Sequence, residues 1–193
     1  MTSISSLENF HKKGFFGDYE NKNEKDLIKI KEKKNLLIVQ LVQYKNSSIA
    51  IKDIDGLSPS DETLKVISNN ETRILWTGPK SWILTSTKKD LLKNIKKIFN
   101  DSDFAITDLS HSRAIIELEG QFSKEILKKG CPFNFNDLKK NKCVNSLFNG
   151  VAVTIDMLDD NPNKIRIFTL RSFGQSLYEF ITDSCLEFGY KSL

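Results

Sequence analysis

The chain has 193 residues, of which 39% are hydrophobic, 28% charged and 10% aromatic, with a formal net charge of +4. This composition supplies enough apolar area for a core, which excludes a chain that is disordered throughout. No apolar run reaches the roughly 18 residues that a membrane-spanning helix needs, and the first residues lack the pattern of a signal peptide. We therefore expect a cytoplasmic protein with no membrane partner, whose three cysteines are reduced core residues.

The first 26 residues are polar and irregular, apart from three phenylalanines at positions 10, 15 and 16. Such a segment is too poor in apolar residues for a core of its own. We expect residues 1–26 to form an arm that is flexible or that docks on a partner. One α+β domain is expected over residues 27–193.

Strand patterns follow the arm. Residues 27–31 predict one strand, and the apolar run 36–42 predicts a central strand because both of its faces are apolar. Residues 73–76 and 82–85 predict a hairpin, since the segment 77–80 between them has turn composition.

A helix is expected over residues 87–99, with Thr87 as its cap and the lysines on its outer face. Two strands are expected next, at residues 104–109 and 113–119, the second with clean alternation of apolar and charged residues. A short helix at residues 122–127 follows.

The last third of the chain repeats the plan of the middle. We expect a strand at residues 151–157, then a turn and a return strand at 165–168. An amphipathic helix that begins at Ser172 follows. The sequence therefore predicts two similar halves, about residues 27–109 and 110–193. Each would have antiparallel strands with helices on one face.

Few residues could carry chemistry. His111 lies close to Asp108 and Ser110 in sequence, but three residues in one turn rarely adopt the geometry of a Ser–His–Asp relay. The cysteines lack the close pairs of zinc ligands, and no glycine-rich phosphate loop occurs. With only four arginines, the lysine-rich middle of the chain is more typical of a solvated surface than of a nucleic-acid interface. We expect no catalytic, cofactor-binding or metal-binding residue in this chain.

Four segments together resemble a known family. They are LWTGPKSWIL at residues 75–84, TDLSHSRA at 107–114, LKKGCPFNF at 127–135 and RSF at 171–173. Each is similar to a motif of the gamma subunit of heterotetrameric sarcosine oxidase, and the order along the chain is the same. The resemblance covers about residues 36–188 and leaves mainly the arm outside.

This resemblance implies a function as well as a fold. The fold would be that of the folate-binding domain of the glycine-cleavage T-protein, and the partners would be the alpha, beta and delta subunits. The complex of that family oxidises sarcosine to glycine, transfers the one-carbon unit to tetrahydrofolate and forms hydrogen peroxide. FAD, FMN, NAD, zinc and tetrahydrofolate would be held by the other subunits, so the gamma chain would be a non-catalytic assembly subunit.

The carboxylates depart from the T-protein pattern. T-protein-like enzymes place a Gly-Gly-x-x-Asp-Asp stretch just before a strand, whereas here Gly150 runs directly into Val151. Asp159 and Asp160 come only after that strand, in an expected turn. A strand of six residues spans roughly 20 Å, so these carboxylates cannot serve the same site. The resemblance thus implies the T-protein scaffold without its chemistry.

Two classes of function remain open. In the leading hypothesis the chain stabilises an assembly, and aromatic side chains of the arm and one tryptophan of the hairpin contact a neighbouring subunit. The candidate interface residues are Phe10, Phe15, Phe16, Trp76 and Trp82. The alternative is a stand-alone folate-binding or aminomethyltransferase-like protein.

Overall fold

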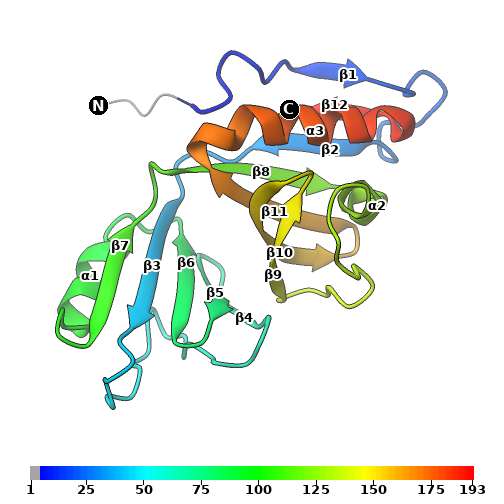
Figure 1. Cartoon of the computed structure of the whole chain (residues 1–193). Helices are drawn as coiled ribbons and strands as arrows, with labels where there is room; N and C mark the ends of the chain where they lie inside the picture. The colour runs from blue at the N-terminus through cyan, green and yellow to red at the C-terminus, as the bar shows by residue number, and fades with distance from the viewer. Residues whose placement is uncertain (1–4) are drawn as a thin grey trace. The chain divides into compact units, whose positions relative to one another are not determined.

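The computed structural model describes residues 5–193, and the chain divides into two compact units (Figure 1). Unit 1 contains the described residues 5–34 together with Ser112–Lys140 and Val144–Leu193. Unit 2 contains Asn35–His111 and Asn141–Cys143. The arm of the chain therefore belongs to the same unit as the C-terminal third.

Unit 1 is built on a seven-stranded sheet with the order β1-β12-β2-β8-β11-β10-β9. Strand β12 is parallel to β2 and antiparallel to β1, while β8 is antiparallel to both β2 and β11. The strands are β1 Gly14–Phe16, β2 Ile28–Glu32, β8 Arg113–Glu119, β9 Cys143–Phe148, β10 Val151–Asp160, β11 Asn163–Leu170 and β12 Tyr190–Ser192.

Two helices, α2 (Ser123–Lys128) and α3 (Gly174–Cys185), pack in unit 1, where α3 contacts β8 and β11 (Figure 1). Short 3₁₀ turns, Arg171–Phe173 and Leu186–Phe188, flank α3. Three residues on the inner face of α3 are buried, whereas Phe173 precedes α3 and is exposed. The buried residues are Leu177, Ile181 and Cys185, which share the core with Ile30, Ile116, Leu118, Ile165 and Ile167. Among the described residues, no helix has both the length and the hydropathy for a membrane crossing.

Unit 2 contains a five-stranded sheet with the order β4-β5-β6-β3-β7 and one helix, α1 (Leu91–Ile98). Its strands are β3 Leu37–Gln43, β4 Val66–Ser68, β5 Thr72–Gly78, β6 Ser81–Ser86 and β7 Phe104–Asp108. The predicted central strand is confirmed, since β3 lies between β6 and β7. The hairpin of β5 and β6 is confirmed as well. Leu91 and Ile95 of α1 are buried in the core of this unit.

The predicted cap at Thr87 and the predicted helix start at Ser172 are both wrong. α1 begins at Leu91 and α3 at Gly174, and neither helix has a side-chain hydrogen bond at its N-cap. Ahead of α1, the backbone N–H of Lys88 donates to Oγ of Ser86 at 3.0 Å, so a serine closes a turn before the helix starts. Local hydrogen bonds of this kind compete with capping, which is why a capping pattern alone misplaced the start.

The glycine at position 189 is held in a left-handed conformation against the arm. Its φ is +67°, and a Cβ atom there would lie 2.4 Å from the carbonyl oxygen of Asp18. Gly150 in the β9–β10 turn is a matched control, because its φ is +83° and a Cβ atom added there would meet nothing within 4 Å. We expect Gly189→Ala to lower the free energy of unfolding by about 2–4 kcal/mol and Gly150→Ala by only about 1 kcal/mol, because only the former adds a steric clash to backbone strain. Urea denaturation measures both, and equal losses would contradict the close approach.

Candidate functional site

The residues that resemble a catalytic relay form a structural turn in unit 2. Oγ of Ser110 donates to Oδ1 of Asp108 at 2.6 Å and accepts from the backbone N–H of Ile38 at 3.0 Å. Burial acts to raise the pKa of Asp108, but the two hydrogen bonds from Ser110 and the nearby charges outweigh it and lower the pKa. His111 is exposed and makes no hydrogen bond to Ser110 within the described part of the chain. The serine hydroxyl is thus engaged in the turn, and His111 is not placed as its base.

The cysteine thiols are buried and free of disulfides. Burial raises the pKa of Cys131 to about 11 and that of Cys185 to about 12. Sγ of Cys143 donates to the carbonyl oxygen of Trp76 at 3.1 Å. Thiols with such pKa values are protonated at neutral pH, so they are poor nucleophiles and poor metal ligands. Within residues 5–193, no cluster of three His, Cys, Asp or Glu side chains has an arrangement that could hold a metal ion.

A row of charged side chains crosses the sheet of unit 1. The row runs across four neighbouring strands. Lys31 of β2 is the cross-strand partner of Glu117 of β8. Glu117 is in turn the partner of Arg166 of β11, and Arg166 that of Asp156 of β10. Nε and one terminal nitrogen of Arg166 donate to Oε1 of Glu117 at 2.9 and 2.7 Å, and Nζ of Lys31 lies 3.1 Å from Oε2. Asp156, Glu117 and Arg166 are only 0%, 3% and 9% exposed. We call these four residues the charged row.

Compensating charge keeps Glu117 ionised in the charged row. Burial alone would raise the pKa of Glu117, but Arg166 and Lys31 together lower it below its usual value. The sequence pattern placed Glu117 on the polar face of its strand, and its burial was missed. No local sequence pattern indicates that Glu117 is buried, since its partner Arg166 is 49 residues away along the chain.

The lowered pKa of Glu117 predicts a pH dependence of stability. Its contribution is complete above the unfolded-state pKa of about 4.3 and is lost as the pH falls through the lower folded-state pKa. Acidification below about pH 4 should therefore reduce the free energy of unfolding, by up to about 1.4 kcal/mol per pH unit for this group. Urea denaturation between pH 3 and 7 measures the slope. We expect a shallower slope for Glu117→Gln, whereas the exposed control Glu125→Gln should keep the wild-type slope.

Asp159 and Asp160, the carboxylates that depart from the T-protein pattern, make contacts within the fold. The turn of Asn149 and Gly150 joins β9 directly to β10, and both residues have positive φ. Asp159 and Asp160 end β10 and do not lie in the turn, which corrects the expected position by two residues. Nζ of Lys140 lies 3.2 Å from Oδ2 of Asp159, and the backbone N–H of Lys140 donates to Asp160 at 2.8 Å. These contacts hold the loop before β9, which contains Lys140, against the end of β10.

The arm carries three of the predicted interface residues. β1 pairs with β12, and the ring of Phe16 stacks on Tyr190 with centroids 5.2 Å apart. Phe15 and Phe10 keep large exposed surfaces, 41% in the case of Phe15. Their contact with a partner stays a prediction.

The two tryptophans face each other across the hairpin but differ in burial. Trp76 and Trp82 are register partners of β5 and β6. Trp82 is 1% exposed, and its Nε1 donates to the carbonyl oxygen of Ser60 at 2.8 Å. Trp76 is partly buried, and its Nε1 has no hydrogen-bond partner among the described residues. Trp82 is therefore a core residue, and Trp76 is the tryptophan that keeps surface for a contact.

No family model matches the sequence. Over 120 residues the chain is 23% identical to sarcosine oxidase subunit gamma of Corynebacterium sp. (strain U-96). The resemblance to that subunit is confirmed. The match covers 61% of this chain and 58% of the relative, so the chain spans less than two thirds of the length of that relative.

Solved structures agree on the fold. One chain of the heterotetrameric sarcosine oxidase from Corynebacterium sp. U-96, in complex with pyrrole 2-carboxylate, superposes with a TM-score of 0.78 at 20% identity and covers 86% of this chain and 87% of that one. The glycine cleavage system aminomethyltransferase T from Bartonella henselae superposes with a TM-score of 0.57 at 10% identity, over 82% of this chain and 46% of that one. The expected α+β class with antiparallel strands and the T-protein-like fold are confirmed.

Proposed function

We propose that this chain is a non-catalytic assembly subunit of a cytoplasmic complex that oxidises sarcosine. The observation that carries the proposal is the structural match to a chain of heterotetrameric sarcosine oxidase over 86% of this chain, joined by sequence similarity to the gamma subunit. The engaged state of Ser110 and the protonated, buried thiols support a role without bond-making chemistry.

The remaining reaction components belong to the partners in this proposal. The complex demethylates sarcosine to glycine, transfers the one-carbon unit to tetrahydrofolate and forms hydrogen peroxide. The alpha, beta and delta subunits hold FAD, FMN, NAD, zinc and tetrahydrofolate, and this chain holds none of them. Its role is to offer a folded surface on which those subunits assemble.

Affinity purification of the tagged chain from its native cells, followed by mass spectrometry, tests the proposal. We expect flavin-containing subunits to copurify and the eluate to oxidise sarcosine with formation of hydrogen peroxide. Recovery of the chain without a flavoprotein would contradict the proposal. The isolated chain is the control and should show no sarcosine oxidation.

The T-protein-like fold keeps one alternative testable, a stand-alone folate-binding protein. That function predicts micromolar binding of tetrahydrofolate to the isolated chain in titration calorimetry, with loss of binding on changing Asp108 or Asp156. Asp108 is hydrogen-bonded within its turn and Asp156 is fully buried, so neither carboxylate is arranged as a free ligand group. We expect no heat of binding, and a micromolar affinity would favour the alternative.

A further inference from the structure

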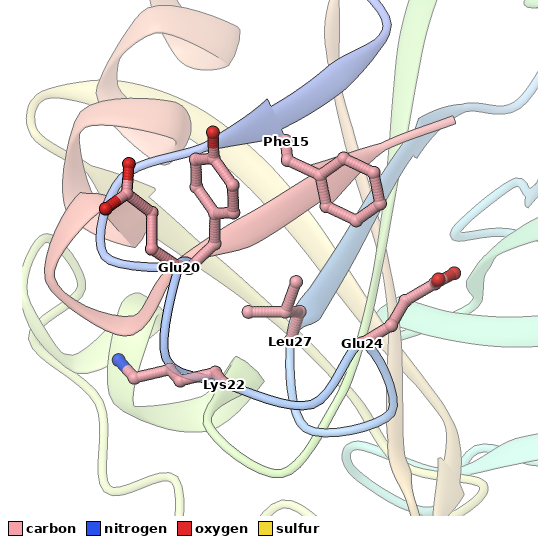
Figure 2. A pocket seen from close by; sticks show the side chains of 6 residues that line it. Phe15, Glu20, Lys22, Glu24 and Leu27 are labelled. Carbon is pink, nitrogen blue, oxygen red and sulfur yellow. The ribbon is translucent and has the colours of Figure 1, made fainter.

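A pocket lies at the edge of unit 1, where the arm packs beside β12. It has a volume of about 380 Å³, which is at the small end of ligand sites and sufficient for one long side chain. Figure 2 shows Leu27 between Glu20 and Lys22 on one side and Phe15 and Glu24 on the other. Tyr19 completes the lining, and its ring centroid is 5.8 Å from that of Phe15. The pocket therefore combines an apolar floor, aromatic walls and charged groups.

Two of the three charged side chains in the pocket are already neutralised. Nζ of Lys22 lies 2.9 Å from a carboxylate oxygen of Asp18. Oε1 of Glu24 accepts from Nζ of Lys191 at 2.5 Å, which lowers the pKa of Glu24. Glu20 is exposed and makes no ion pair or hydrogen bond with any residue that the structure describes. The pocket is thus left with one uncompensated negative charge.

The aromatic walls favour a cation as the occupant. The ammonium of Lys191 lies 5.1 Å from the centroid of Phe15, so this ring already contacts one cation, and much of its surface remains exposed. A cationic side chain over an aromatic face gains about 0.5–1 kcal/mol at an exposed site. Arginine suits the pocket because its planar group stacks on rings and binds a carboxylate with two hydrogen bonds, while its aliphatic stem can cover Leu27.

The position of the pocket favours a polypeptide over a small molecule. Phe15 is the middle residue of β1, and β1 is the outermost strand of the sheet. The outer edge of β1 pairs with no described strand, so its backbone groups are available to an extended segment of another chain. A segment that adds to this edge would carry its side chains past the pocket.

We infer that this pocket anchors an arginine side chain of a partner subunit whose extended segment runs along the edge of β1. The inference rests on the proposed function, because it assigns the assembly contact to Glu20, Phe15 and Tyr19. It also gives the arm a role in recognition.

Charge reversal at Glu20 tests the anchor. The chain and the purified remaining subunits are mixed, and the dissociation constant is measured by biolayer interferometry. We expect Glu20→Lys to weaken binding at least tenfold. Phe15→Leu, which keeps apolar volume and removes the ring, should weaken it about twofold to fivefold. The matched control is Asp101→Lys, an exposed charge reversal in unit 2, which should change binding less than twofold. Thermal melting verifies that the variants are folded.

A photo-crosslinker at position 15 identifies the contacting segment. We expect an arginine in the crosslinked peptide, and replacing that arginine with glutamate should restore the affinity of Glu20→Lys. Two results would overturn the anchor: wild-type affinity of Glu20→Lys, or a crosslinked peptide without an arginine. In either case, formation of the complex would leave the proposed function standing. If the wild-type chain binds none of the subunits, the proposed function fails and the anchor fails with it.

Discussion

Replacing Arg166 with alanine is expected to lower the free energy of unfolding by about 3–5 kcal/mol. The loss follows from the charged row, since Glu117 is buried and both nitrogens that neutralise its Oε1 belong to Arg166. Without Arg166, the Glu117 carboxylate is left in the sheet with only the partly exposed Lys31 beside it. Urea denaturation followed by circular dichroism measures the change.

Lys164 is the matched control for this prediction. It lies two residues before Arg166 on the same strand and pairs with Glu119 at 2.8 Å, but its side chain is partly exposed. Ion pairs of this kind are worth about 0–1 kcal/mol, so Lys164→Ala should cost no more than that. Adding Glu117→Gln to Arg166→Ala should recover part of the loss by removing the unpaired charge. Equal losses for the two alanine variants would show that Arg166 does not hold Glu117 in place.

Trp82→Ala is expected to lower the free energy of unfolding by about 3–5 kcal/mol, because it opens a cavity in the core of unit 2. It also removes the hydrogen bond from Nε1 to the carbonyl oxygen of Ser60. Trp82→Phe removes the same hydrogen bond without opening a large cavity, so it should cost only about 1–2 kcal/mol. Trp76→Ala should cost less than Trp82→Ala, since Trp76 is only partly buried. The chain has two tryptophans, so each variant keeps one as the fluorescence reporter of unfolding. A larger loss for Trp76→Ala would contradict the assignment of Trp82 to the core.

Local patterns were enough to predict most strands. β3 is a long apolar run, and the hairpins of β5 with β6 and of β10 with β11 have strand residues on both sides of turn residues. β1 and β12 were not predicted as strands, because each has three residues and no periodicity can be read from so few. Their pairing joins the two ends of the chain, and only the folded structure brings them together.

The features of the candidate site were harder to predict than the strands. Alternation along β8 correctly separated Ile116 from Glu117, but it cannot show that the charged face is also buried. The hairpin pattern likewise does not distinguish Trp82 from Trp76, which are register partners on β6 and β5. The pocket beside Phe15 depends on which charges are already paired, and Lys191 comes from the opposite end of the chain. A local sequence pattern cannot predict contacts between residues so far apart in the chain.

The place of β12 in the sheet has a consequence for biosynthesis. β12 lies between β1 and β2, although a ribosome makes both of those strands long before β12. Strand β1 therefore has no neighbour to pair with until residues 190–192 have been translated. During that interval the backbone groups of residues 14–16 that pair with β12 have no strand partner.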